Sequence, residues 1–369
     1  MIPVFKPSCS EAEIAAVAEV LRSGWWGLGP KTAEFEKAFA SYIGGAASVG
    51  LNSGTAALHL ALKVLDVTGG EVVTTPMTFV STNHAILYNQ ATPVFCDVEA
   101  DTMNIDPGWV ERSVSDRTRA IVVVHYGGHP VDLDAIRSIA APRGIPVLED
   151  AAHACGARYK GVRIGRDADI ACFSFHAVKN LAMGEGGAVV ARDPALVARL
   201  RQLRWLGINK GTWERSADGH GYSWAYNVDE VGFKYHLNDI PAAIGLAQLA
   251  RLDQLNERRR AIVAQYDAAF STLDWLVRPV EKPYASSSRH NYVVKVPRRD
   301  ELMKFLAARG IMTGMHYIPN HLYDVYKPFR RTLPVVEREW TKLVTLPLYP
   351  SMTASEVAQV IDGLLAFPA

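Results

Sequence analysis

The sequence has few cysteines, and it has no excess of charge of either sign. Its 369 residues include only four cysteines, Cys9, Cys96, Cys155 and Cys172, and no two of them have CxxC spacing. This pattern argues against a disulfide framework or a cysteine-based zinc site, and it favours a reducing compartment. Lys and Arg together number 39, whereas Asp and Glu number 38. The chain therefore has no overall field that would attract nucleic acid or an anionic membrane.

Several functional motifs are also missing. No stretch approaches the ~20 apolar residues of a membrane-spanning helix, and the first residues lack the basic and apolar regions of a signal peptide. We therefore expect a soluble, cytoplasmic protein that contacts no membrane. The sequence has no GxSxG hydrolase elbow and no GxxxxGK[ST] phosphate loop. His125, His129, Asp132 and His153 lack HExxH spacing, so we expect no metal site.

Strand-like and helix-like patterns alternate in the first half of the chain. The strand-like runs are 71–75, 92–97, 119–125, 146–150 and 170–175. Runs of this kind, separated by helical patterns, predict an α/β fold with a mostly parallel central sheet flanked by helices. In such folds ligands bind at the carboxyl ends of the strands, where Asp97, His125, Asp150 and Lys179 are expected to lie.

The second half predicts a smaller domain. A long helix is expected from Asp239 to Phe270, and mixed strand and helix patterns follow it. These include helices at 300–309 and 335–344 and a strand at 311–317. We place a large domain at residues 1–250 and a small C-terminal α+β domain at residues 251–369, both within the usual size range of domains.

Lys179 lies between two apolar, strand-like runs within the segment 168–192. Burial near the end of a strand favours the neutral form of a lysine amine. A neutral amine can form an imine with a carbonyl compound. A surface lysine in a hairpin is equally compatible with this segment alone.

Two other polar positions suggest a partner for Lys179. Asp150 ends an apolar run, and it either caps the next turn or presents its charge to a cleft. The turn at Gly54-Thr55 opens an apolar helix, and it is either an ordinary cap or an anion site. Together an amine, a carboxylate and an N–H-rich turn match the aldehyde, the pyridine nitrogen and the phosphate of pyridoxal phosphate.

The region 198–236 is rich in arginine, lysine and tryptophan. Such a mixture suits a nucleotide diphosphate, because rings stack on the base while cations bind the phosphates. It also suits a subunit interface, where Arg and Trp are enriched. The composition leaves both uses open.

Read together, the motifs resemble the DegT/DnrJ/EryC1/StrS family of sugar aminotransferases, which are pyridoxal phosphate enzymes of fold-type I. The segments that carry the resemblance are SGWWGLGPKTAEFE, NSGTAALHLAL, TPMTFVSTNHAI, EDAAHACGA, SFHAVKNLAMGEGGAVV, GFKYHLNDIPAAIG, HYIPNHLY and LPLYP. They span nearly the whole chain, and the segments containing the lysine and GEGG are the most specific. The resemblance implies the fold-type I architecture.

The resemblance also implies roles for individual residues. Lys179 would bind the cofactor aldehyde and carry protons, Asp150 would pair with the ring nitrogen, and His153 would lie close to the ring. The remaining implied cofactor contacts are Phe79 on the ring and Gly54, Thr55 and Ser174 on the phosphate. Lys234 stands where many members have an asparagine that reaches the phosphate from the second subunit. The segments that line the sugar or nucleotide in relatives contain Trp26, Trp213, His316 and Tyr317.

The function implied by the resemblance is amino transfer from glutamate to a nucleotide-linked keto-sugar. The sugar would be a 3-keto or 4-keto, often 6-deoxy, compound of amino-sugar or lipopolysaccharide biosynthesis. A homodimer with shared active sites is implied, and neither nucleic acid nor membrane is an expected partner. The alternatives are a ketocyclitol aminotransferase and a non-catalytic regulator that keeps the fold. A related dehydratase branch has histidine in place of Lys179, which argues against that branch.

Overall fold

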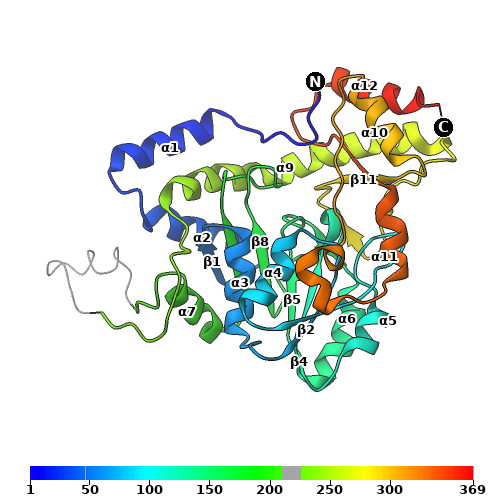
Figure 1. The fold of residues 1–369 in the computed structure, drawn as a ribbon. Coiled ribbons are helices and arrows are strands. Elements are labelled where there is room, and N and C mark those ends of the chain that lie inside the picture. The colour runs from blue at the N-terminus through cyan, green and yellow to red at the C-terminus, as the bar shows by residue number, and fades with distance from the viewer. Residues whose placement is uncertain (46, 210–225, 369) are drawn as a thin grey trace.

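The computed structural model describes residues 1–45, 47–209 and 226–368, and a seven-stranded sheet lies at its centre (Figure 1). The order of the strands is β1-β9-β8-β5-β4-β2-β3. Their bounds are Ala47–Leu51 (β1), Glu71–Thr74 (β2), Thr92–Phe95 (β3), Thr118–Val124 (β4), Val147–Asp150 (β5), Ile170–Ser174 (β8) and Gly187–Ala191 (β9). The pairs from β3 to β8 are parallel, and β9 runs antiparallel to both of its neighbours, β8 and β1. The predicted mostly parallel α/β sheet is confirmed.

Helices cover both faces of this sheet. One face packs against α2 (Pro30–Ile43), α6 (Leu133–Ala140) and the first half of α9, and the other against α3 (Gly54–Val64), α4 (Val80–Tyr88) and α7 (Pro194–Leu203). Side chains of strand β8 point alternately to the two faces of the sheet, because Cys172 belongs to the apolar core on one face and Phe173 to the core on the other. Burial on both faces explains why its sequence is almost continuously apolar.

Two helices begin with capping boxes. Ser10 and Glu13 cap α1 (Glu11–Ser23), and Thr353 and Glu356 cap α12 (Ala354–Leu365) in the same reciprocal way. Helix α1 ends at Gly24, whose φ of 73° is in the left-handed region that favours glycine.

Helix α9 (Asp239–Ala269) leads from the large sheet to a separate C-terminal core. This core contains the antiparallel pair β11 (Tyr292–Lys295) and β12 (Leu343–Leu346), together with α10 (Arg299–Ala307) and α12. The N-terminus lies beside this core (Figure 1), where Ile2 bridges Ile311. The predicted domain boundary after residue 250 falls within α9 and stays a prediction.

Two sequence predictions in the C-terminal region are wrong. The helix expected at 335–344 is α11 (Pro334–Glu339), and residues 343–346 form β12 instead. The strand expected at 311–317 is reduced to isolated bridges at Ile311 and Gly314. In the first case pairing with a distant strand outweighs the local pattern, since β12 pairs with β11.

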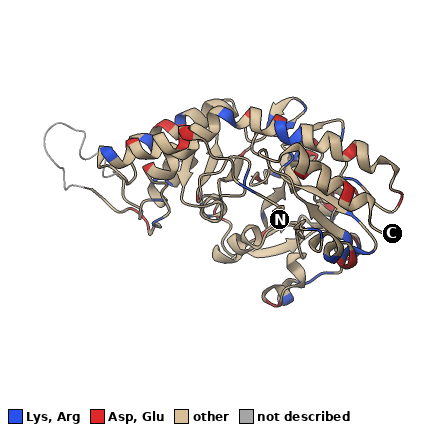
Figure 2. Cartoon of the chain, turned by 90° about the horizontal axis from the view of Figure 1, so that it is seen from above, with Lys and Arg blue, Asp and Glu red and all other residues tan. Residues whose placement is uncertain are grey.

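The remaining elements are short. One of them is the helix α5 (Pro107–Ser113). A small sheet is formed by β6 (Arg158–Tyr159), β7 (Val162–Arg163) and β10 (Ala285–Ser286). The 3₁₀ turns are Tyr126–Gly128, Ala141–Arg143, Phe270–Thr272, Asn320–Leu322, Asp324–Phe329 and Trp340–Lys342. Basic and acidic residues are interspersed along the outer helices in Figure 2. Within the described ranges, no helix is both long and apolar enough to cross a membrane.

Candidate active site

A cavity of about 400 Å³ lies at the carboxyl ends of β5 and β8. Parallel strands end together at one edge of the sheet, and connecting loops leave a hollow there. Most of the residues that the sequence singles out line this cavity. They are Gly54, Thr55, Phe79, Asp150, His153, Ser174, Lys179, His316 and Tyr317.

Lys179 enters the cavity from the turn between β8 and β9, where its N–H donates to the carbonyl of His176 at 2.8 Å. The side chain retains some exposure because it lines the cavity, but protein surrounds its ammonium group. This burial lowers the pKa of Lys179 to about 8, although the nearby Asp150 acts in the opposite direction. The amine is therefore partly neutral near physiological pH.

Asp150 is the last residue of β5 and is only 3% exposed. Its Oδ2 accepts a hydrogen bond from the Thr82 hydroxyl at 2.7 Å, and its Oδ1 accepts one from the Ala152 N–H at 3.1 Å. Burial raises the pKa of Asp150, while these two hydrogen bonds and Lys179 oppose the rise. The carboxyl group is thus held in one orientation, and a cationic ligand atom would favour its charged form.

The first turn of α3 forms the anion-binding end of the cavity. The Ser53 hydroxyl accepts from the Ala56 N–H at 3.0 Å and caps the helix, and the N-terminal residues Gly54 and Thr55 line the cavity. Free N–H groups and the helix dipole at such an end favour a phosphate. A Cβ at Gly54 would lie 2.8 Å from the Cβ of Ser174, so only glycine allows this approach.

Aromatic and imidazole rings form the other walls. The Phe79 ring is 56% exposed and lies 6.0 Å from the Tyr317 ring, between centroids. The Tyr317 hydroxyl lies 3.1 Å from Nε2 of His153, whereas no described residue forms a hydrogen bond with its buried Nδ1. Burial, Lys179 and His316 keep the pKa of His153 well below its usual value. The His153 ring is therefore neutral.

These residues fit pyridoxal phosphate. The cavity offers an amine, a fixed carboxyl group and a helix N-terminus for the three polar ends of the cofactor, and the exposed Phe79 ring offers an apolar face. The ring of Phe79 would otherwise be an unusually exposed aromatic side chain. Lys179, Asp150 and the first turn of α3 with Ser174 are the groups that would hold the cofactor.

Two of the predicted residues, Trp26 and Lys234, do not line the cavity, and a third lies outside the described residues. Trp26 is 54% exposed in the loop after α1, and its Nε1 donates to the carbonyl of Leu21 at 3.2 Å. The Nζ of Lys234 lies 3.4 Å from the centroid of the Trp205 ring, and its reach into a second subunit stays a prediction. Trp213 lies outside the described residues.

The sequence reasoning missed Thr82, which orients Asp150. A signal for it exists, because Thr82 follows Phe79 by three residues at the start of α4 and so faces the same side. No comparable local pattern points to His290, whose ring stacks on His153 at 4.4 Å. His153 and His290 are separated by more than one hundred positions in the chain.

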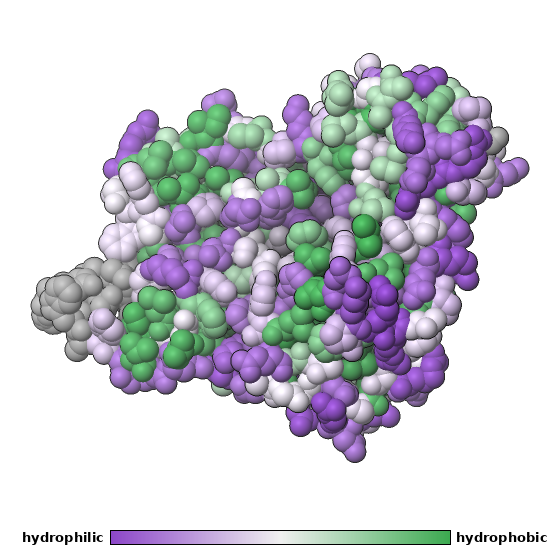
Figure 3. Space-filling model, in the orientation of Figure 1, coloured by the Kyte–Doolittle hydropathy of each residue, from purple (hydrophilic) through white to green (hydrophobic). Residues whose placement is uncertain are grey.

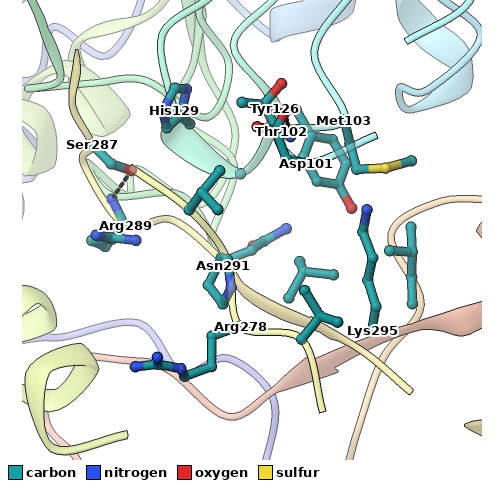
Figure 4. A pocket seen from close by; sticks show the side chains of 16 residues that line it. Asp101, Thr102, Met103, Tyr126, His129, Arg278, Ser287, Arg289, Asn291 and Lys295 are labelled. Carbon is teal, nitrogen blue, oxygen red and sulfur yellow. Dashed lines mark hydrogen bonds between the residues drawn. The ribbon is translucent and has the colours of Figure 1, made fainter. Parts of the chain in front are cut away.

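A second, smaller cavity lies behind Tyr126 (Figure 4). Its volume is about 40 Å³, which suits one or two water molecules rather than a sugar. Asn291 is buried within it, and neither end of its amide is hydrogen-bonded to the described residues. In the described ranges, no group of three or more His, Cys, Asp or Glu side chains could hold a metal ion.

The burial of Lys179 predicts a gain in stability when its charge is removed. The pKa is about 8 in the folded protein and 10.5 ordinarily, so the unfolded chain binds more protons between these values. Burial of the charged ammonium destabilises the folded protein by on the order of 3 kcal/mol. This destabilisation is complete below about pH 8 and disappears as the pH rises through 10.5. We expect the free energy of unfolding of cofactor-free Lys179→Met to exceed that of the wild type by this amount near pH 7.

Urea unfolding near pH 7 and above pH 10.5 measures this difference. Lys160→Met is the matched control, because Lys160 is an exposed lysine that pairs with Asp134. A Lys179→Met protein that is no more stable than wild type near pH 7 would show that the ammonium is not destabilised by burial.

Comparison with known proteins assigns the chain to a family. The model of the DegT/DnrJ/EryC1/StrS aminotransferase family matches residues 7–365. The spore coat polysaccharide biosynthesis protein SpsC of Bacillus subtilis is 41% identical, over 98% of this chain and 96% of its own. The sugar aminotransferase CalS13 of Micromonospora echinospora superposes with a TM-score of 0.91 at 35% identity, over 99% of both chains.

A third relative has been solved with cofactor forms. Spr1654 of Streptococcus pneumoniae, in its PMP-form, superposes with a TM-score of 0.92 at 32% identity, over 98% of both chains, and a PLP-form is also known. These similarities extend over the large sheet and the C-terminal core alike. The chain is an aminotransferase that belongs to the DegT/DnrJ/EryC1/StrS family.

Proposed function

We propose that the protein uses pyridoxal phosphate to transfer an amino group from glutamate to a 3-keto or 4-keto sugar linked to a nucleotide. The observation that supports this most directly is the convergence of Lys179, Asp150 and the first turn of α3 on one cavity. Each of these groups suits a different end of the cofactor. The PLP-form and PMP-form of Spr1654 and the sugar aminotransferase CalS13 support the same assignment.

When bound, pyridoxal phosphate supplies an aldehyde that takes up the amino group and a ring that draws electrons from the reacting carbon. Lys179 is then the proton carrier, because a pKa of about 8 leaves both protonation states populated at working pH. Its Nζ can accept a proton from the carbon that gives up the amino group and deliver it to the carbon that receives the amino group.

Asp150 holds the proton on the ring nitrogen. Its two hydrogen bonds, from Thr82 and from the Ala152 N–H, leave the carboxyl group little freedom to turn. A carboxylate in that position stabilises a cationic nitrogen in a site of low dielectric. His153 is neutral and adds no competing positive charge beside this pair.

The substrate side is built from residues further from β5. His316 and Tyr317 line the cavity, and burial lowers the pKa of His316 to about 4, so its ring is neutral. We assign these rings to the sugar, with Trp26 and Trp213 as further contacts. A ketocyclitol in place of the nucleotide-linked sugar is the second candidate substrate, because Lys179 and Asp150 would serve it equally.

We further propose a homodimer with shared active sites, in which Lys234 reaches the partner's phosphate. Apolar residues gather over α1 on the face shown in Figure 3. Exposed ones include Ile14, Leu21 and Trp26, and Val228 and Val231 belong to the segment that leads to Lys234. A second copy would cover such a surface. The cysteines are free, which supports a reducing, cytoplasmic location.

The first test is whether the cofactor binds Lys179 and exchanges its amino group. We expect the protein with pyridoxal phosphate to be yellow, and borohydride to abolish the colour and leave a pyridoxyl mass adduct on the peptide containing Lys179. Glutamate should convert the bound cofactor to its amine form. A panel of nucleotide-linked keto-sugars and ketocyclitols, read by mass spectrometry, then identifies the acceptor.

Each outcome of this test is informative. A colourless protein that retains no cofactor contradicts the proposed function. A yellow protein that does not respond to glutamate or other amino donors supports a regulator that keeps the fold and lacks the reaction. Conversion of a ketocyclitol but no nucleotide-linked sugar would transfer the proposal to the second substrate class.

A further inference from the structure

Next to His153, the rings of two residues distant in the chain form a stack. The His290 ring lies 4.4 Å from the His153 ring with an interplanar angle of 27°, and the Phe5 ring lies 5.5 Å from His290 at 5°. His290 is 2% exposed and follows the strand β10, whereas Phe5 belongs to the N-terminal segment. Near-parallel rings at these separations attract one another. The stack therefore supports one face of the His153 ring.

Asn180 fixes the orientation and the tautomer of His290. The Nδ2 of Asn180 donates to the Ser288 carbonyl at 2.9 Å and to Oδ1 of Asn256 at 2.7 Å. A carbonyl can only accept, so the amide oxygen of Asn180 faces His290, at 3.0 Å from its Nδ1. The hydrogen of the neutral ring must then be on Nδ1.

The stack is closed by the N-terminal segment. The N–H of Ile2 donates to the Gly310 carbonyl at 2.7 Å, and the carbonyl of Val4 accepts from Leu348 at 3.1 Å. These bonds attach the segment to the C-terminal core, and Phe5 then covers His290. Phe5 also contacts the edge of the His316 ring at 5.5 Å. The position of His153 thus depends on three separate parts of the chain.

We propose that His290 is a positioning residue for the amino-transfer reaction, holding the His153 ring in place beside the cofactor, with Asn180 and Phe5 fixing His290. This inference rests on the proposed function. Asn180 follows Lys179 directly, so the same hydrogen-bond network also anchors the backbone next to the reacting amine. Burial and the nearby His153, Lys179 and Arg259 keep the pKa of His290 well below its usual value, so the stack carries no charge.

The alternative is that His290 serves the fold alone, as any buried ring does. The two roles differ in what they affect. A residue that only supports the fold changes the stability of the cofactor-free protein and leaves the bound cofactor as it was. A positioning residue changes the orientation of the bound cofactor and the rate of the chemical step.

The test compares variants of the cofactor-loaded protein. His290→Leu removes the aromatic face and the Nδ1 hydrogen, whereas His290→Phe keeps the face and loses the hydrogen bond. His129→Leu is the matched control, because His129 is also buried and bonded through both ring nitrogens but lines the second cavity. The readouts are the visible circular dichroism of the cofactor, its dissociation constant, and kcat and KM for glutamate.

We expect His290→Leu to weaken cofactor binding about tenfold, the loss that corresponds to one aromatic pair. Its dichroism should fall, and kcat should fall more than KM changes. His290→Phe should restore most of the dichroism. Phe5→Leu, which alters a partly exposed residue, should shift the same readouts in the same direction by about threefold.

The inference is overturned if His290→Leu changes only the stability of the cofactor-free protein, as the His129→Leu control is expected to do. If His290→Leu does not fold, Phe5→Leu decides, and unchanged dichroism and kcat in that variant overturn the inference. Failure of the proposed function itself is recognised separately, because the wild-type protein would then show no cofactor band at all.

Discussion

Replacing Lys179 with alanine is expected to lower kcat/KM for amino transfer at least about ten-thousand-fold. Two contributions are lost together, the covalent attachment of the cofactor and the proton carrier at the reacting carbon. The amine is held in the cavity with a pKa of about 8, which burial lowers and the charge of Asp150 raises. No second lysine lines the cavity to replace it within the described residues.

Stopped-flow absorbance with glutamate measures this prediction. Lys179→Ala should still bind pyridoxal phosphate, and the phosphate and ring contacts should remain, but borohydride should leave no adduct on the protein. Added ethylamine should restore part of the rate, because a free amine can enter the space vacated by the side chain. Lys160→Ala is the control and should behave as the wild type. Normal turnover by Lys179→Ala would assign the proton transfer to another residue.

A Lys179→Arg variant separates charge from chemistry. Arginine keeps a positive charge near Asp150, but its guanidinium stays protonated at any working pH and cannot form an imine. We expect it to be as inactive as the alanine variant. Because Lys179→Met is also expected to stabilise the cofactor-free protein, the native lysine reduces stability in exchange for activity.

The second large effect is expected for Asp150→Asn, with a loss of about a thousandfold in the glutamate half-reaction. The amide has the same shape, and it retains an oxygen that can accept from Thr82, but it cannot stabilise a proton on the ring nitrogen. Cofactor binding should weaken much less, since the contacts of Lys179 and α3 remain. Single-turnover absorbance measures the rate.

Thr82 provides the graded control for this prediction. Thr82→Val removes the hydroxyl that donates to Asp150 at 2.7 Å, and we expect about a tenfold loss, whereas Thr82→Ser should be close to wild type. An Asp150→Asn protein that retains more than a tenth of the wild-type rate would mean that Asp150 does not pair with the ring nitrogen.

The candidate site shows which parts of a structure local sequence can predict. The sequence predicts Asp150, Lys179 and Gly54-Thr55 because Asp150 ends a strand, Gly54-Thr55 opens a helix and Lys179 follows a strand, and those boundaries are visible in hydrophobic patterns. The helix expected at 335–344 failed because its last residues pair with β11, some fifty positions earlier. A pattern that covers ten residues contains no information about such a partner.

By itself, the sequence determined the order of strands and helices in the first half of the chain, the helix caps, and the residue types at the ends of the parallel strands. Those features depend on neighbouring residues and on the alternation of apolar side chains. Only the tertiary structure decided that Thr82 holds Asp150 and that Phe5 and His290 support His153. Such contacts join segments that are remote in the chain, and they arise only once the sheet and the C-terminal core have packed together.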